Sequence, residues 1–159
     1  MVKIGVVSDS HGRQIMLEMF ADKCRAEGYD YVFHLGDTRD DAKWLERNLS
    51  VPLISVAGNC DAFSRHQREV RPTFEGHRFI AVHGDGQSVK YGYERLSYYA
   101  EDAGAEVALF GHTHQQFIGW VGSVLLINPG ALRNGHYAEI ILEGKDIIPR
   151  GLNLNDSNK

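Results

Sequence analysis

The chain has 159 residues, of which 43% are hydrophobic and 24% charged, and this composition is typical of an ordinary globular domain. Its length is enough for one domain with a real core and is short for two. The net charge of −4 and the pI of about 6.0 argue against a nucleic-acid binder that relies on bulk positive charge. No apolar run approaches the roughly 20 residues of a membrane span.

The first third of the chain predicts alternating strands and helices. A continuous apolar run at Ile4–Ser8 is typical of a buried strand. Apolar residues at helical spacing follow over Arg13–Glu27, and Gly28 ends that helix. The pattern continues with a strand at Tyr31–Leu35, a short helix near Asp40–Asn48 and a strand at Pro52–Val56. This order implies parallel pairing with right-handed crossovers.

The rest of the chain is richer in hairpins, with strand pairs flanking Gly76 and Gly122. The expected elements are strands at Val70–Glu75 and His77–Val82, a helix at Tyr91–Ala103, strands at Glu106–Phe110, Gln116–Val121 and Ser123–Ile127, and a last strand at Tyr137–Leu142. A parallel first half joined to an antiparallel-rich second half indicates an α/β fold with two sheets face to face and helices outside. We expect one domain over residues 1–152 and a flexible polar tail over residues 153–159.

Six apolar runs end directly in residues of the kinds that bind metals or phosphate. Ligand sites of open α/β sheets lie outside the carboxyl ends of the strands, so distant parts of the chain meet there. The six junctions are Ser8-Asp9-Ser10-His11, Gly36-Asp37, Gly58-Asn59-Cys60-Asp61, His83-Gly84-Asp85, Gly111-His112-Thr113-His114 and Asn128-Pro129-Gly130. Their Asp, Asn and His side chains supply the oxygen and imidazole ligands of a two-metal site, so the pattern predicts a metal-dependent hydrolase.

Each junction alone has a simpler interpretation. Asp9-x-His11 also fits a turn that opens the following helix, and Gly58-Asn59 also fits a tight turn. Histidines two residues apart on an extended loop face opposite ways, so His112 and His114 reach one centre only if the chain turns between them. Five ligand-bearing loops in order, each after its own strand, form a far more specific pattern than any one of them.

The ordered motifs resemble those of the calcineurin-like metallophosphoesterase superfamily. The resemblance covers about residues 1–142 and is closest to the small single-domain YfcE-type phosphodiesterases, which share the Gly58–Asp61 and Asn128–Gly130 motifs. It implies a four-layer α/β/β/α sandwich of two mixed β-sheets flanked by helices, the metallo-dependent phosphatase fold. It also implies two divalent metal ions, with manganese expected first and nickel, iron or zinc as alternatives.

The resemblance assigns the metal ligands by motif position. The first ion would take Asp9, His11 and His114, the second would take Asn59, His83 and His112, and Asp37 would bridge the two. Two such ions lower the pKa of a shared water, and the bridging hydroxide then attacks phosphorus in line. The ions also offset the charge that grows on the phosphoryl oxygens. Asp37 and Asn59 are therefore expected in the catalytic centre.

Cys60 is the main departure from the superfamily, whose commonest form has histidine at that position. A thiol, with a reference pKa of about 8.5, is a poor substitute for an imidazolium acid. We expect Cys60 either to favour good leaving groups or to leave the acid role to another group, and a thiol that only fills space is an equal alternative. Asp61 is expected to orient a neighbouring ligand, or else to pair with an arginine. Asp85 and Ala131 also differ from common family residues and bear on substrate preference.

We therefore expect a metal-dependent phosphoesterase that prefers phosphodiesters to monoesters, a preference that comes from the resemblance alone. The alternative is a scaffold or interaction protein with this fold and little turnover. A retromer scaffold subunit resembles the fold and also lacks the histidine after the Asn of the motif. Competent residues at all seven ligand positions favour the enzyme. The expected substrate is a small phosphodiester or nucleotide-like compound, and neither bulk nucleic acid nor a membrane is an expected partner.

The cysteines indicate a reducing compartment, because Cys24 and Cys60 make neither a disulfide framework nor a CxxC motif. The strand pattern starts at the first residues, so we expect no signal peptide and a cytoplasmic protein. A small domain without a cap leaves its metal cleft open. We allow for a homo-oligomer, in which a second copy supplies the walls of the cleft.

Overall fold

The computed structural model describes residues 1–58 and 66–156, so Asn59, Cys60 and Asp61 lie outside the described residues. One sheet contains β1 (Val2–Val7), β2 (Tyr31–His34), β3 (Leu53–Ser55), β10 (His136–Glu143) and β11 (Asp146–Asn153). The other contains β4 (Glu69–Val70), β5 (Thr73–Phe74), β6 (His77–Val82), β7 (Val107–Leu109), β8 (Phe117–Val121) and β9 (Val124–Asn128). The α-helices of the described part are α1 (Gln14–Glu27), α2 (Arg39–Asn48) and α3 (Glu94–Asp102).

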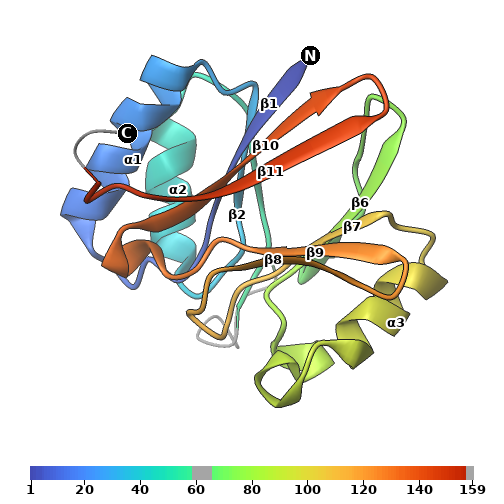
Figure 1. Cartoon of the computed structure of the whole chain (residues 1–159). Coiled ribbons are helices and arrows are strands. Elements are labelled where there is room, and N and C mark those ends of the chain that lie inside the picture. The colour runs from blue at the N-terminus through green and yellow to red at the C-terminus, as the bar shows by residue number, and fades with distance from the viewer. Residues whose placement is uncertain (59–65, 157–159) are drawn as a thin grey trace.

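The elements form the predicted four-layer α/β/β/α sandwich, which confirms the fold class (Figure 1). Helices α1 and α2 cover the outer face of the first sheet, and α3 covers the outer face of the second. Both sheets are mixed. The first has the order β11-β10-β1-β2-β3, and the second has the order β4-β6-β7-β9-β8 with β5 paired to β6.

The parallel strands place the polar junctions of the described residues at the carboxyl ends of two sheets. Strands β1, β2 and β3 run parallel in the first sheet, and β6, β7 and β9 run parallel in the second. Each of these strands is followed by, or ends in, one of the junction motifs. The carboxyl ends of parallel strands share one edge of a sheet, so the topology gathers the motifs.

Three apolar clusters hold the layers together. The first lies between the sheets and includes Ile4, Phe33, Leu109 and Ile127, all fully buried. The second packs α1 and α2 on the first sheet, and the third packs α3 on the second. The burial of apolar side chains supplies the main driving force for this packing.

The strand expected at Val70–Glu75 is interrupted at Pro72, which cannot donate a backbone hydrogen bond, and forms β4 and β5, each paired with β6. Two other elements also differ from the sequence-based expectation. Residues Asp146–Asn153 form the edge strand β11, paired along its length with β10. Pro149 argues against a strand here in the sequence alone, because proline cannot donate a backbone hydrogen bond. An edge strand accepts proline, since one side of its backbone needs no partner. The expected tail from Asn153 onward overlaps the end of β11, and Leu154 packs against the second cluster.

The other difference concerns the helix expected at Tyr91–Ala103, which begins only at Glu94. Gly92 has φ of 132°, which interrupts the helical backbone, and Val89–Tyr91 forms a separate 3-10 turn.

None of the helices in the described ranges is both long and apolar enough to cross a membrane. Cys24 is buried and unpaired, and its burial raises the pKa of the thiol to about 12, so it is a structural residue and not a reactive one.

Candidate metal centre

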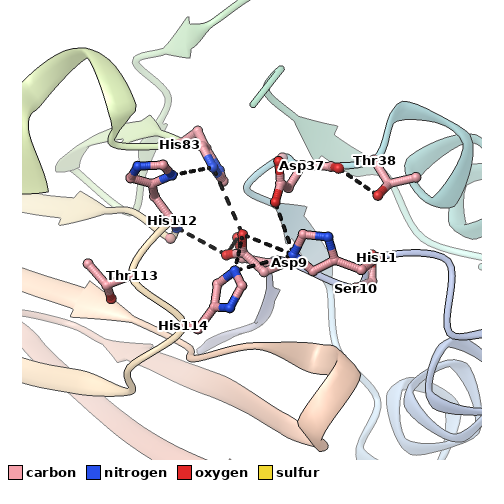
Figure 2. A network of polar contacts seen from close by, with 12 residues as sticks. Asp9, Ser10, His11, Asp37, Thr38, His83, His112, Thr113 and His114 are labelled. Carbon is pink, nitrogen blue, oxygen red and sulfur yellow. Dashed lines mark hydrogen bonds and ion pairs between the residues drawn. The ribbon is translucent and has the colours of Figure 1, made fainter. Parts of the chain in front are cut away.

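Four of the predicted ligands converge where the two sheets meet. Asp9, His11, Asp37 and His114 each offer one ligand atom, and these atoms lie within 4.8 Å of one another. Figure 2 shows the carboxylate of Asp9 at the middle of the group, with the imidazoles of His11 and His114 directed toward it. The four residues come from three loops, after β1, β2 and β7.

The distances describe a compact set of donors. The Nε2 atom of His11 lies 3.0 Å from Asp37 Oδ2 and 3.8 Å from Asp9 Oδ1. The Nε2 atom of His114 lies 3.3 Å from Asp9 Oδ1 and 3.2 Å from the Nε2 atom of His11. Two imidazole nitrogens and two carboxylates that face one point are a ligand set suited to a divalent transition metal.

A second pair of imidazoles lies beside this group. His112 Nδ1 is 3.2 Å from His83 Nε2, which in turn is 3.9 Å from Asp9 Oδ1. His83 Nδ1 donates to the carbonyl oxygen of Leu35 at 2.7 Å, so its proton is on Nδ1 and its Nε2 lone pair is available to a metal. Burial, followed by the charges of His83 and Lys90, lowers the pKa of His112 and keeps its ring in the neutral form that metals bind.

The backbone of the ligand loops is strained. Positive φ angles outside glycine occur in the described residues at Asp9 (53°), His11 (48°), Asp37 (90°), His112 (70°), His114 (64°), Glu75 (51°) and Ser88 (55°). Five of these seven positions are predicted metal ligands. Such conformations cost on the order of 1–3 kcal/mol each and persist at functional sites where the surroundings impose them. The left-handed turns at His112 and His114 bring histidines two residues apart into one centre.

Glycines allow the loops to approach one another closely. A Cβ atom at Gly58 would lie 2.5 Å from the backbone nitrogen of Asp37, and one at Gly111 would lie 2.7 Å from Asp9 Oδ2. Real Cβ atoms do not approach other atoms this closely, so the loops meet in this way only with glycine at both positions.

The side chain of Asn128 holds the histidine loop, residues 111–114, in place. Its Nδ2 atom donates to the carbonyl oxygen of Gly111 at 3.2 Å and to Thr113 Oγ1 at 2.9 Å. Its Oδ1 atom accepts from the backbone nitrogen of Gly130 at 2.9 Å. The Asn128-Pro129-Gly130 motif, to which the resemblance assigned no metal ligand, thus fixes the residues on both sides of His112.

The residues present fit a metal ion. Asp9 is fully buried, and its Oδ1 atom has no hydrogen-bond partner among the described residues. Its Oδ2 atom accepts from Ser8 Oγ at 2.6 Å and from the backbone nitrogen of His112 at 3.0 Å. A buried carboxylate oxygen without a partner is costly, and a bound cation would satisfy it. Of the other predicted residues, Asn59, Cys60 and Asp61 lie outside the described part of the chain, so their contacts do not enter this geometry.

An open depression of about 400 Å³ adjoins the histidine loop, and its lining includes Lys90, Tyr93, Thr113 and Gln115. A larger hollow of about 570 Å³ lies between α1 and the β10–β11 pair and contains none of the predicted ligands. The metal group is itself partly open, since the side chain of His114 is 39% exposed. A small molecule therefore reaches the group from solvent.

Comparison with known proteins gives relatives along most of the chain. A family profile described as the calcineurin-like phosphoesterase superfamily domain matches residues 2–141. A probable metallophosphoesterase of Bacillus subtilis is 31% identical over 128 residues, which cover 80% of this chain and 73% of the relative. A phosphodiesterase of Methanocaldococcus jannaschii is 26% identical over 144 residues, which cover 81% of this chain and 83% of the relative.

Solved structures repeat the same architecture. A predicted phosphoesterase of Streptococcus pneumoniae has a TM-score of 0.80 at 25% identity, covering 97% of this chain and 90% of that chain. A single mutant of Vps29 from Entamoeba histolytica has a TM-score of 0.84 at 16% identity, covering 98% and 94%. At that identity the likeness to Vps29 concerns the fold alone.

Proposed function

Because the chain belongs to the calcineurin-like phosphoesterase superfamily, we propose that it hydrolyses phosphoric esters with two divalent metal ions and prefers phosphodiesters. The observation that carries the proposal is the group of Asp9, His11, Asp37 and His114, in which the buried Oδ1 atom of Asp9 accepts no hydrogen bond from the described residues. The diester preference is supported by the resemblance of the motifs and by the relative named as a phosphodiesterase.

In this proposal, Asp9, His11 and His114 would hold the first ion, His83, His112 and Asn59 would hold the second, and Asp37 would be a ligand of both. When bound, the two ions supply a hydroxide nucleophile near neutral pH and offset the charge on the phosphoryl oxygens. Manganese is the first candidate, and nickel, iron and zinc are the others. The mixture of carboxylate and imidazole donors suits all four.

The chain contributes by holding these donors ready before any ion binds. The hydrogen bond from His83 to Leu35 sets the tautomer of that ring, and the lowered pKa of His112 removes a competing proton. The two hydrogen bonds to Asp9 Oδ2 leave Oδ1 directed into the group. Ligands fixed in this way lose little further conformational freedom on binding, which favours affinity.

Cys60 is proposed to limit the range of leaving groups, because a thiol transfers a proton less readily than an imidazolium near pH 7. We expect Cys60→His to raise the rate for alkyl phosphodiesters by roughly 10-fold or more, within the usual range of general acid catalysis. The rate for 4-nitrophenyl esters, whose leaving group needs no proton, is expected to stay unchanged. An equal response of both ester types contradicts an acid role at this position.

The proposed activity is tested with metal-free protein reloaded with manganese, nickel, zinc or iron. Bis(4-nitrophenyl) phosphate and 4-nitrophenyl phosphate serve as the diester and the matching monoester. We expect metal-dependent hydrolysis that is faster for the diester and that disappears in Asp37→Ala and His112→Ala. Background rates with every metal, while circular dichroism shows an intact fold, would support the alternative of a scaffold with this fold.

A further inference from the structure

Three buried polar side chains next to the metal centre have no place among the proposed ligands. Ser10 and His34 are fully buried, and Asp41 is 6% exposed. They come from three elements: Ser10 from the loop after β1, His34 from the end of β2, and Asp41 from the first turn of α2. Buried polar groups of this kind need partners, and these three bond to one another.

The hydrogen bonds between them have one direction. The backbone nitrogen of Gly36 donates to His34 Nδ1 at 3.3 Å, so the proton of the neutral ring is on Nε2. That atom lies 3.0 Å from Ser10 Oγ and donates to it. Ser10 Oγ in turn donates to Asp41 Oδ2 at 2.6 Å. Each donor points toward the Asp41 carboxylate, and bonds aligned in this way strengthen one another.

The carboxylate at the end of this series is well supported. Asp41 Oδ2 also accepts from the backbone nitrogen of Gly12 at 2.7 Å. Asp41 lies in the first turn of α2, where the positive end of the helix dipole favours a negative charge. The series therefore anchors the loop from Ser10 to Gly12 on the start of α2.

The bonded residues alternate with the metal ligands along the chain. Ser10 separates Asp9 from His11, and Gly36 precedes Asp37. Asp9, His11 and Asp37 all have positive φ angles. Unfavourable backbone conformations persist only when other interactions impose them. The Ser10–His34–Asp41 series bonds to both strained loops and supplies such interactions.

We propose that Ser10, His34 and Asp41 are positioning residues that hold Asp9, His11 and Asp37 in their metal-binding conformations and so set the affinity of the first metal ion. This inference rests on the proposed metal centre. The three side chains do not act on substrate, because burial separates them from solvent. Their effect passes through the backbone of the two loops.

Removal of the Ser10 hydroxyl tests the proposal directly. In Ser10→Ala, His34 Nε2 and Asp41 Oδ2 both lose a partner. We expect the Kd of one of the two Mn²⁺ ions to rise by about 10–100-fold, the usual effect of losing an outer-shell partner. The Kd of the other ion, which shares only Asp37 with the first, should rise less. The readout is Mn²⁺ titration of metal-free protein, followed by calorimetry or by electron paramagnetic resonance.

Ser97 provides a matched control. Its side chain is also buried, and its Oγ atom donates to the carbonyl oxygen of Val121 at 2.6 Å, on the α3 side of the molecule. Ser97→Ala removes an equally short buried hydrogen bond and is expected to lower thermal stability without any change in Mn²⁺ affinity. Because Ser97 lies away from the metal centre, a loss of affinity restricted to Ser10→Ala separates positioning from general destabilisation.

Asp41→Asn covers the case in which Ser10→Ala does not fold. The amide keeps an acceptor oxygen for Ser10 but loses the charge, so an intermediate loss of Mn²⁺ affinity is expected. In the double variant of Ser10→Ala and Asp41→Asn, the losses should not add, because both act on the same hydrogen bond between Ser10 and Asp41: one removes it and the other weakens it. Wild-type affinity in folded Ser10→Ala or Asp41→Asn overturns the inference. Failure of the wild type to bind Mn²⁺ instead overturns the proposed metal centre.

Discussion

Asp9→Asn is expected to abolish binding of the first metal ion and to lower diester hydrolysis by at least about 100-fold, the upper end of the loss seen when an outer-shell partner is removed. The substitution keeps the shape of the side chain and removes its negative charge. Asp9 Oδ1 lies within 4 Å of His11, His83 and His114, so an amide at this point weakens the donor set at its centre. Within the described part of the chain, the buried Oδ1 atom accepts no hydrogen bond, so a bound cation would satisfy it.

Thermal unfolding separates this effect from a loss of folding. An ion present at 100 times its Kd stabilises the native state by about 2.7 kcal/mol, which corresponds to roughly 5–11 °C in Tm for a chain of this size. We expect Mn²⁺ to raise the Tm of the wild type by an amount in this range and to raise that of Asp9→Asn clearly less. Without metal, Asp9→Asn should unfold at no lower temperature than the wild type, because it removes a buried charge.

Asp102→Asn, on the exposed side of α3, makes the same charge change and serves as the control. Equal responses of Asp9→Asn and the wild type to Mn²⁺ contradict the assignment of Asp9.

Gly111→Ala is expected to disable the centre although it replaces none of the proposed ligands. The added Cβ would lie 2.7 Å from Asp9 Oδ2 and 2.9 Å from Ser8 Cβ, both fully buried. The loop after β7 must then move away from the loop after β1, and His112 and His114 move with it. Overpacking of this kind costs about 1–3 kcal/mol, so the Tm should fall by several degrees. Mn²⁺ affinity and diester hydrolysis should fall much further than stability does.

Gly86→Ala is the matched control for that substitution. Gly86 lies in the short 3-10 turn Asp85–Gln87, and a Cβ there would meet no atom within 4 Å. We expect it to leave Mn²⁺ affinity and Tm close to those of the wild type. If folded Gly111→Ala binds Mn²⁺ as tightly as Gly86→Ala does, the close approach of the two loops is not needed for metal binding.

The parallel strands and the polar residues that follow them could be predicted from the sequence alone. Apolar runs such as Ile4–Ser8 and Tyr31–Leu35 have the continuous pattern of buried parallel strands, and β1 and β2 occupy these positions. The order of strands and helices then predicted that their carboxyl ends would meet. The convergence of Asp9 with Asp37, from separate strands, follows from that topology.

Other features depend on tertiary contacts that no local pattern records. The Asn128 side chain donates hydrogen bonds to Gly111 and Thr113 in another loop. The sequence therefore showed the motif that contains Asn128 but not its structural role. The bond between Ser10 and Asp41 joins residues 31 positions apart, and the junction motif that contains Ser10 does not indicate Asp41 as its partner. The positive φ angles at His112 and His114 likewise arise from loop packing and not from residue type.

The most direct test of the dinuclear centre is the number of Mn²⁺ ions that metal-free protein binds. Titration of the wild type, with Asp9→Asn in parallel, measures the stoichiometry without reference to any substrate. We expect two ions per chain in the wild type and the loss of one in Asp9→Asn. A wild-type chain that keeps its fold but binds one ion or none contradicts the proposed dinuclear centre.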